Sequence, residues 1–251
     1  MAGHSQFANI KHRKGAQDKK RASLFTKLAR EIMVAAKSGL PDPVYNSRLK
    51  LAIANAKASS MPKDRIEAAI KKATSAGTGE NYENVRYEGY APGGIALIIE
   101  TLTDNRHRTV SDVRSSITKF GGSLGEAGSV AFMFDHVGII RFKKSIASEE
   151  IMFEAAIEAG ADNCESGEEL HEITCNTNSF GAVSKFLTDK FGDAEHNAMG
   201  WKPKNLIEVD FEQADKLEDL IEKLEDLDDV QYVFTNHIYS EEVAKKLAEK
   251  E

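Results

Sequence analysis

Residues 85–102 read Val-Arg-Tyr-Glu-Gly-Tyr-Ala-Pro-Gly-Gly-Ile-Ala-Leu-Ile-Ile-Glu-Thr-Leu, and here the sequence pattern changes from helical to extended. A Pro-Gly-Gly turn at residues 92–94 divides this stretch, and an apolar run follows it. Extended segments on both sides of such a turn are typical of a β-hairpin. We therefore predict a hairpin with strands at Val85–Tyr90 and Ile95–Leu102.

The sequence before this hairpin has the apolar spacing of amphipathic helices. The spacing recurs in Asp18–Ser38, in residues 44–58 and in a third segment that opens at Pro62. Glycines follow the first and third segments, and glycine commonly ends a helix. The pattern predicts a domain of three helices over residues 1–80.

The sequence after the hairpin alternates between helices and strands. Its central part has the element order βαββαβ, which is that of a ferredoxin-like domain. The predicted elements there are strands at Gly138–Phe142, Asn163–Cys164, Glu169–Cys175 and Ala194–Trp201, and helices at Ser148–Ala159 and Phe180–Phe191. The elements predicted around them are helices at Arg108–Phe120 and Glu212–Leu224, and strands at Val130–Phe134, Leu206–Val209 and Val230–Thr235. The elements after the βαββαβ unit are too few to form a domain of their own. We therefore expect them to combine with the elements before the unit into one domain.

We therefore expect an α+β multidomain protein: an N-terminal three-helix domain, then an α+β domain carrying an inserted ferredoxin-like βαββαβ domain. The expected divisions are a basic helical domain with a flexible N-terminal arm (1–80), a discontinuous α+β domain (81–135 and 206–240), the insertion (136–205) and a C-terminal tail (241–251).

Composition favours a folded protein of the cytoplasm. The chain has 251 residues, of which 41% are hydrophobic and 29% charged, so intrinsic disorder is a poor interpretation. The two cysteines form no metal-binding or disulfide pattern, which fits a reducing compartment. No apolar run reaches the length of a membrane span, so we expect no membrane partner.

Charge is unevenly divided along the sequence. Residues 1–80 hold 16 Lys and Arg against 6 Asp and Glu, a balance of +10, whereas the remainder has a balance of −17. A basic segment attached to an acidic body indicates a polyanionic partner, and nucleic acid is the common one. The alternative is a solvated lysine-rich helical surface.

Two segments are candidates for nucleic-acid contacts. The first is the arm with the start of the first helix, where dense positive charge repels itself until phosphates neutralise it. Its candidate residues are Lys11, His12, Arg13, Lys14, Lys19, Lys20, Arg21, Lys27 and Arg30. The second joins a strand to a helix, where Asn105, Arg106 and Arg108 stand near amides that favour an anion. A helix cap with two surface arginines explains this second segment equally well.

The sequence offers little support for catalysis. Gly121-Gly-Ser-Leu-Gly125 matches the string of a hydrolase nucleophile elbow, but an elbow needs a strand before the serine and a helix after it, and the predicted order is the reverse. The histidines lack metal-ligand spacing, and no phosphate-binding glycine loop is present. We expect no catalytic residue, no metal, no cofactor and no small-molecule substrate.

Several longer motifs resemble those of the YebC/PmpR family, which includes a mitochondrial translational activator. The matching stretches are Ala2-Gly-His-Ser, Ala8-Asn-Ile-Lys-His-Arg-Lys, Ala16-Gln-Asp, Phe25-Thr-Lys-Leu-Ala-Arg-Glu-Ile, Met61-Pro-Lys-Asp, Tyr87-Glu-Gly-Tyr-Ala-Pro-Gly-Gly, Leu102-Thr-Asp-Asn-Arg and Gly121-Gly-Ser-Leu-Gly. The resemblance covers essentially the whole chain. It implies three domains and a non-enzymatic role.

Two functions remain open at this point. The resemblance implies a DNA-binding transcriptional regulator, or a translation factor that binds ribosomal or transfer RNA on the ribosome and assists elongation through difficult sequences. Both ligands are phosphate polymers, so charge does not separate them. The predicted helices show no element that combines Asn, Gln and Arg for reading base edges, which makes sequence-specific DNA reading the less supported of the two.

Overall fold

The structure is a computed structural model, and it describes residues 17–74 and 81–250. The helices are α1 (Gln17–Lys37), α2 (Ser47–Ala58), α3 (Lys63–Thr74), α4 (Arg106–Lys119), α5 (Glu149–Ala159), α6 (Phe180–Phe191), α7 (Phe211–Glu225) and α8 (Glu241–Lys250). The strands are β1 (Glu83–Ala91), β2 (Ile95–Thr103), β3 (Ser123–Leu124), β4 (Phe134–Lys143), β5 (Asn163–Ser166), β6 (Leu170–Asn176), β7 (His196–Pro203), β8 (Ile207–Val209), β9 (Val230–Thr235) and β10 (His237–Tyr239). The expectation of a mixed protein with a helical N-terminal region is confirmed.

The chain divides into two compact units. Among the described residues, unit 1 holds 17–27, 81–135 and 201–250, and unit 2 holds 28–74 and 136–200. Within unit 1, β1 and β2 form the predicted hairpin, with Tyr87 opposite Ile99 in the antiparallel register. The full sheet has the strand order β3-β1-β2-β9, and a parallel pair, β10-β8, accompanies it.

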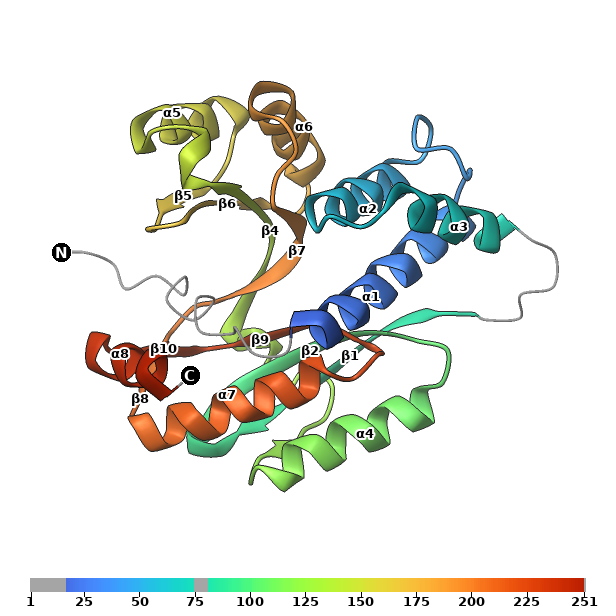
Figure 1. Cartoon of the computed structure of the whole chain (residues 1–251). Helices are drawn as coiled ribbons and strands as arrows, with labels where there is room; N and C mark the ends of the chain where they lie inside the picture. The colour runs from blue at the N-terminus through green and yellow to red at the C-terminus, as the bar shows by residue number, and fades with distance from the viewer. Residues whose placement is uncertain (1–16, 75–80, 251) are drawn as a thin grey trace. The chain divides into compact units, whose positions relative to one another are not determined.

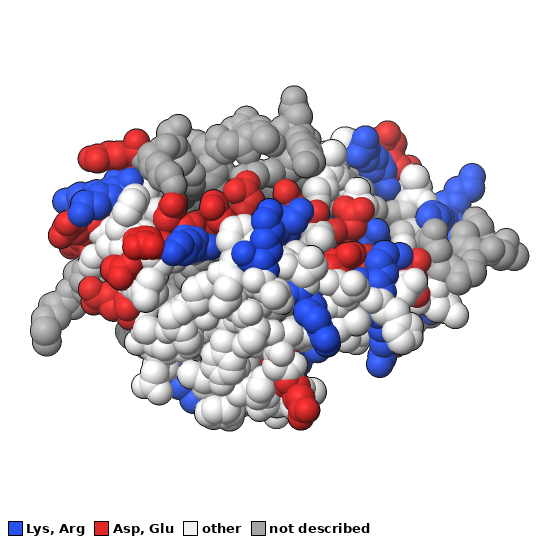
Figure 2. All heavy atoms as spheres, turned by 90° about the horizontal axis from the view of Figure 1, so that it is seen from below, with Lys and Arg blue, Asp and Glu red and all other residues white. Residues whose placement is uncertain are grey.

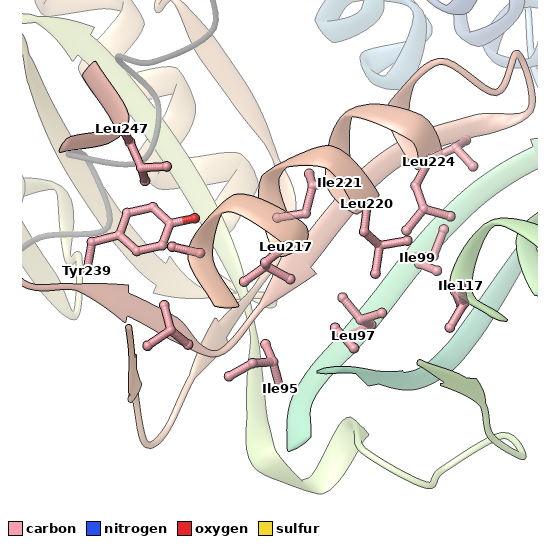
Figure 3. Close-up of a cluster of buried hydrophobic side chains, with 14 of the residues drawn as sticks. Ile95, Leu97, Ile99, Ile117, Leu217, Leu220, Ile221, Leu224, Tyr239 and Leu247 are labelled. Carbon is pink, nitrogen blue, oxygen red and sulfur yellow. The ribbon is translucent and has the colours of Figure 1, made fainter. Parts of the chain in front are cut away.

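The main core of unit 1 lies between this sheet and its helices. Figure 1 shows α4 and α7 on one face of the sheet. Leu220 of α7 points toward Leu97 and Ile99 of β2, and all three side chains are fully buried (Figure 3). The opposite face carries a second cluster, in which Ile98 packs with Phe134 and Trp201. Residues far apart in sequence therefore build one layered unit.

Unit 2 contains a four-stranded sheet with the order β5-β6-β4-β7, covered by α5 and α6. Its fully buried core includes Ile140 of β4, Met152 of α5 and Val183 of α6. Helix α2 also contacts this part, because Leu51 packs against the core and the Asn55 side chain donates a hydrogen bond to the Asn197 carbonyl. The helix pair α2–α3 is thus not isolated from the sheet of its unit.

The strand predicted at Val130–Phe134 is wrong. Residues 131–133 form a single 3₁₀ turn, and β4 starts only at Phe134. The cause is the buried Glu88 carboxylate, which accepts hydrogen bonds from the backbone N–H groups of Gly128, Val130 and Ala131 at 2.9 Å each. Backbone donors engaged by a side chain cannot pair in a ladder.

The prediction of a C-terminal tail is also wrong for residues 241–250. They form helix α8, whose Val243 and Leu247 are buried in the main core of unit 1. The sequence carried the pattern, since these two residues are four apart and so share one helix face. The burial of that face against Tyr239 gives the segment its fixed place.

Candidate nucleic-acid interface

The candidate residues of the arm, Lys11, His12, Arg13 and Lys14, lie outside the described residues. Lys19 and Lys20 lie in α1, whose backbone is described there while the side chains are not. The described part of the expected interface therefore starts at Arg21. Its guanidinium lies over the Phe25 ring, 5.4 Å from the centroid, and the residue is exposed. This contact holds the guanidinium against its own helix while it stays exposed to solvent. The side chain therefore loses little conformational entropy on binding.

Lys27 does not belong to an exposed basic face. Only 9% of the residue is exposed, and its ammonium donates a hydrogen bond to the carbonyl of Glu225, at the end of α7. A cation suits that position because the last carbonyls of a helix carry partial negative charge. Helical spacing places Lys27 correctly on α1 but says nothing of its tertiary partner. Arg30, three residues on, is half-buried.

Asn105 has a structural role at the start of α4. Its side chain accepts a hydrogen bond from the backbone N–H of Arg108, 3.1 Å away, which makes it the N-cap of the helix. Capping of this kind stabilises a helix by roughly 1 kcal/mol. The cap interpretation of the segment is therefore realised in the structure.

Arg106 and Arg108 both have carboxylate partners inside the chain. Arg106 makes a two-pronged ion pair with Glu83, and hydrogen bonding to Arg106 lowers the pKa of that carboxyl. Arg108 contacts Asp229 and Asp104, each at 2.8 Å, and the hydrogen bond to Asp229 is the largest cause of its raised pKa. A phosphate at this site would have to compete with these carboxylates.

Asp229 is the common hydrogen-bond partner of three polar side chains in the Thr103–Thr109 segment. The carboxylate is buried and accepts hydrogen bonds from the hydroxyls of Thr103 and Thr109 as well as from Arg108. The network ties the end of β2 and the first turn of α4 to the loop before β9. It gives Thr103, Arg108 and Thr109 of the Thr103–Thr109 motif a structural role, since the polar group of each has a partner in the network.

Sequence reasoning missed a set of basic residues on the first three helices. Within residues 21–74, Lys27 is buried, and Arg30 and Arg48 are half-buried. Arg21, which was predicted, is exposed. The exposed basic residues of this range that were not among the predicted contacts are Lys37, Lys50, Lys57, Lys63, Arg65, Lys71 and Lys72. Their spacing opposite the apolar positions of the helices was the signal that could have identified them.

The face drawn in Figure 2 carries mixed charge. On the face drawn in Figure 2, acidic and basic side chains are interleaved in a band, and a broad area beside it is mostly uncharged. Several ion pairs of the two units are of this mixed kind, such as Lys216 with Glu212 on α7 and Lys185 with Asp189 on α6. Mixed charge of this sort does not form the continuous positive surface that attracts a polyanion.

Ser123 does not stand on a strand-to-helix turn. It follows α4 and lies in β3, opposite Tyr90 of β1. The surrounding glycines serve this close pairing, because a Cβ on Gly122 would come within 2.4 Å of the Tyr90 carbonyl oxygen. Among the described residues, no group of three His, Cys, Asp or Glu side chains is placed to hold a metal ion. No helix in 17–74 or 81–250 is both long and apolar enough to cross a membrane.

Comparison with known proteins matches nearly the whole chain. The family model described as the TACO1/YebC protein N-terminal domain matches residues 5–76, and the one described as the TACO1/YebC second and third domain matches residues 82–237. The crystal structure of a conserved hypothetical protein from Aquifex aeolicus is similar, with 43% sequence identity and a TM-score of 0.86. That similarity covers 94% of this chain and 98% of the Aquifex chain. The chain belongs to the TACO1/YebC family.

Proposed function

We propose that the protein is a non-enzymatic, nucleic-acid-binding regulator of gene expression, of the DNA-binding transcriptional type. One observation carries the proposal: most of the positive charge within residues 21–74 is displayed on exposed side chains, in a chain that is acidic elsewhere. Phosphate contacts from Lys and Arg supply most sequence-independent affinity for nucleic acid. The family to which the chain belongs is of a transcription-regulator type, which supports the same proposal.

The proposed contact residues are those of the arm and of the start of α1, namely Lys11, His12, Arg13, Lys14, Lys19, Lys20, Arg21 and Arg30. Lys27 is left out because its ammonium is buried against Glu225. For Asn105, Arg106 and Arg108 we propose a structural role, since capping and carboxylate pairing already engage them.

We also propose the domain arrangement expected from the sequence, with residues 136–205 as a ferredoxin-like insertion. The element order β4-α5-β5-β6-α6-β7 and the strand order β5-β6-β4-β7 support it, because both belong to that fold. Residues 81–135 and 206–240 would then be the two halves of one domain. Their strands β1, β2 and β9 share one sheet, which supports this division.

A translation factor that binds ribosomal or transfer RNA is the second candidate. It is favoured by the side chains on the first three helices. Within residues 21–74, the two amide side chains are Asn46, which is buried, and Asn55, which is half-buried and bonded to Asn197. Amides are the usual readers of adenine in the major groove, so this surface suits phosphate contacts better than base-specific ones.

The two candidates can be separated by crosslinking the protein in cells and sequencing both the DNA and the RNA recovered. A transcriptional regulator should enrich a small set of promoter segments. A ribosome-bound factor should enrich ribosomal or transfer RNA, and the protein should sediment with ribosomes at low salt and leave them as salt rises. Recovery of neither nucleic acid above a tag-only control would contradict both candidates.

A further inference from the structure

The loop between α1 and α2, residues 38–46, exposes three large apolar side chains. Leu40 is 61% exposed, Val44 78% and Tyr45 75%. Single exposed apolar residues are common on protein surfaces, but a group of them within six residues of one loop indicates a contact with another molecule. The group belongs to unit 2, and none of its three residues is among the contact residues proposed above.

This loop is held in one shape by its own polar groups. The buried Asn46 amide donates to the carbonyls of Ala35 (2.7 Å) and Leu40 (2.9 Å), and its oxygen accepts from the N–H of Leu49 (3.0 Å). Asp42 accepts from the N–H of Val44 through its side chain, at 2.9 Å. Because the loop is already ordered, little conformational entropy remains to be lost when Tyr45 binds.

Close packing at Gly39 adds to this order. A Cβ at that position would come within 2.9 Å of the Asn46 amide nitrogen, so glycine allows the asparagine to reach both carbonyls. Pro41 and Pro43 further restrict the backbone by fixing their own φ angles. The apolar side chains therefore stand on a supported loop.

The charge around the loop is positive. In Figure 1, α2 runs back from the loop and α3 returns in the opposite direction, so the last turns of α1 and α3 lie at the same end of the helices as the loop. Those turns carry Lys37, Lys71 and Lys72, and Lys50 is exposed in the first turn of α2. Residues 28–74 as a whole have nine basic and four acidic residues. Proteins that bind single-stranded nucleic acid without sequence preference combine stacking aromatic side chains with a positively charged surface.

Helix α5 offers an internal comparison. Phe153 and Ile157 are also exposed, at 52% and 62%, but Glu150, Glu154 and Glu158 lie on the same helix. These carboxylates repel phosphates, so the exposed apolar residues of α5 do not suit a contact with nucleic acid. Of these two exposed apolar groups, the one on the α1–α2 loop is therefore the better candidate for a contact with nucleic acid, because the charge around it is positive.

We propose that the α1–α2 loop binds an unpaired segment of nucleic acid, with Tyr45 stacked on a base, Leu40 and Val44 against the edges of that base, and Lys50 near the backbone phosphates. This inference rests on the proposed function and extends it, because it adds recognition of unpaired bases to the phosphate contacts of the arm and α1. Stacking requires a base free of its neighbours, so a continuous duplex should not use the loop.

The test compares binding of the full chain to three labelled ligands of about 12 nucleotides: single-stranded RNA, single-stranded DNA of matching sequence, and a duplex. Tyr45→Ala should weaken binding to the single strands by about fivefold or more and leave duplex binding unchanged. Tyr45→Phe should keep the parent affinity, whereas Tyr45→Leu should lose as much as Tyr45→Ala. Phe153→Ala is the matched control and should bind as the parent does. The ratio of the two single-strand affinities shows which sugar the site prefers.

Tyr45→Trp gives a second readout. The only native tryptophan, Trp201, is buried, so quenching of the new indole by a single strand, but not by the duplex, would report stacking directly. Equal single-strand affinity of the parent chain and Tyr45→Ala would overturn this inference, as would full binding by Tyr45→Leu. Failure of the parent chain to bind any of the three ligands would instead overturn the proposed function.

Discussion

Some single residues in this protein have structural roles that cannot be predicted from the residue type. Glu88 looks like an ordinary strand glutamate in sequence, yet it organises the loop before β4 through three backbone hydrogen bonds. Lys27 looks like part of a basic surface and is instead a buried donor to Glu225. In both cases the partner is distant in sequence, so local patterns could predict the helix or strand but not the contact.

Glu88 makes a prediction about pH. Burial alone would raise the pKa of its carboxyl, but the N–H groups of Val130, Gly128 and Ala131 together outweigh burial and lower it. A lowered pKa means that the carboxylate stabilises the fold above the ordinary pKa of 4.5, and that this contribution is lost as pH falls through the lowered value.

Glu88→Gln should therefore reduce the free energy of unfolding by about 2 kcal/mol at neutral pH, because an amide cannot satisfy all three donors. The difference from the parent chain should shrink when both are unfolded by denaturant at pH 3. Glu126→Gln, at an exposed position of the same loop, is the control. A difference that stays constant from pH 7 to pH 3 would contradict this role.

At the scale of elements, the apolar periodicity of the sequence was sufficient to predict a helix or strand wherever the apolar positions are the buried ones. The hairpin, α1 and the alternation of helices and strands in residues 136–205 were predictable, because each has a strong apolar repeat. The 3₁₀ turn at residues 131–133 was not, since its cause is a carboxylate from another strand. The short strand β3 was missed because its pairing with β1 depends on close glycine contacts, which leave no apolar pattern.

Helix α8 has a highly charged sequence, yet it contributes to the hydrophobic core. Its residues are mostly Glu, Lys and Ala, and only Val243 and Leu247 reach the core. Leu247→Ala should lower the free energy of unfolding by about 2 kcal/mol or more, because it leaves a cavity beside Tyr239.

The matched control is Lys245→Ala on the exposed side of the same helix, which should change stability by less than about 0.5 kcal/mol. Denaturant unfolding of the two variants measures both values. Equal stability of Leu247→Ala and Lys245→Ala would mean that α8 does not contribute to the core.

At the scale of the whole molecule, the division of charge was predictable from sequence, but the surface that displays it was not. Counting residues located the basic excess in residues 1–80. It could not tell that Arg106 and Arg108 are engaged by Glu83 and Asp229, because those carboxylates lie far away in the sequence. It also overlooked the lysines of α2 and α3 and the apolar loop before α2, whose exposure depends on how the helices pack.

The central claim is that the basic residues near the N-terminus carry the affinity for nucleic acid. The most direct measurement is the salt dependence of RNA binding for two full-length variants that each lose four positive charges. One replaces Lys14, Lys19, Lys20 and Arg21 by Gln, and the control replaces the exposed Lys143, Lys185, Lys204 and Lys216 by Gln.

The proposed interface predicts that the first variant binds more weakly. Its slope of log affinity against log salt should fall by about 1 for each phosphate that it no longer neutralises. The control should keep the slope of the parent chain. Equal reductions of affinity and slope in the two variants would contradict the claim, because binding would then follow net charge rather than the N-terminal surface.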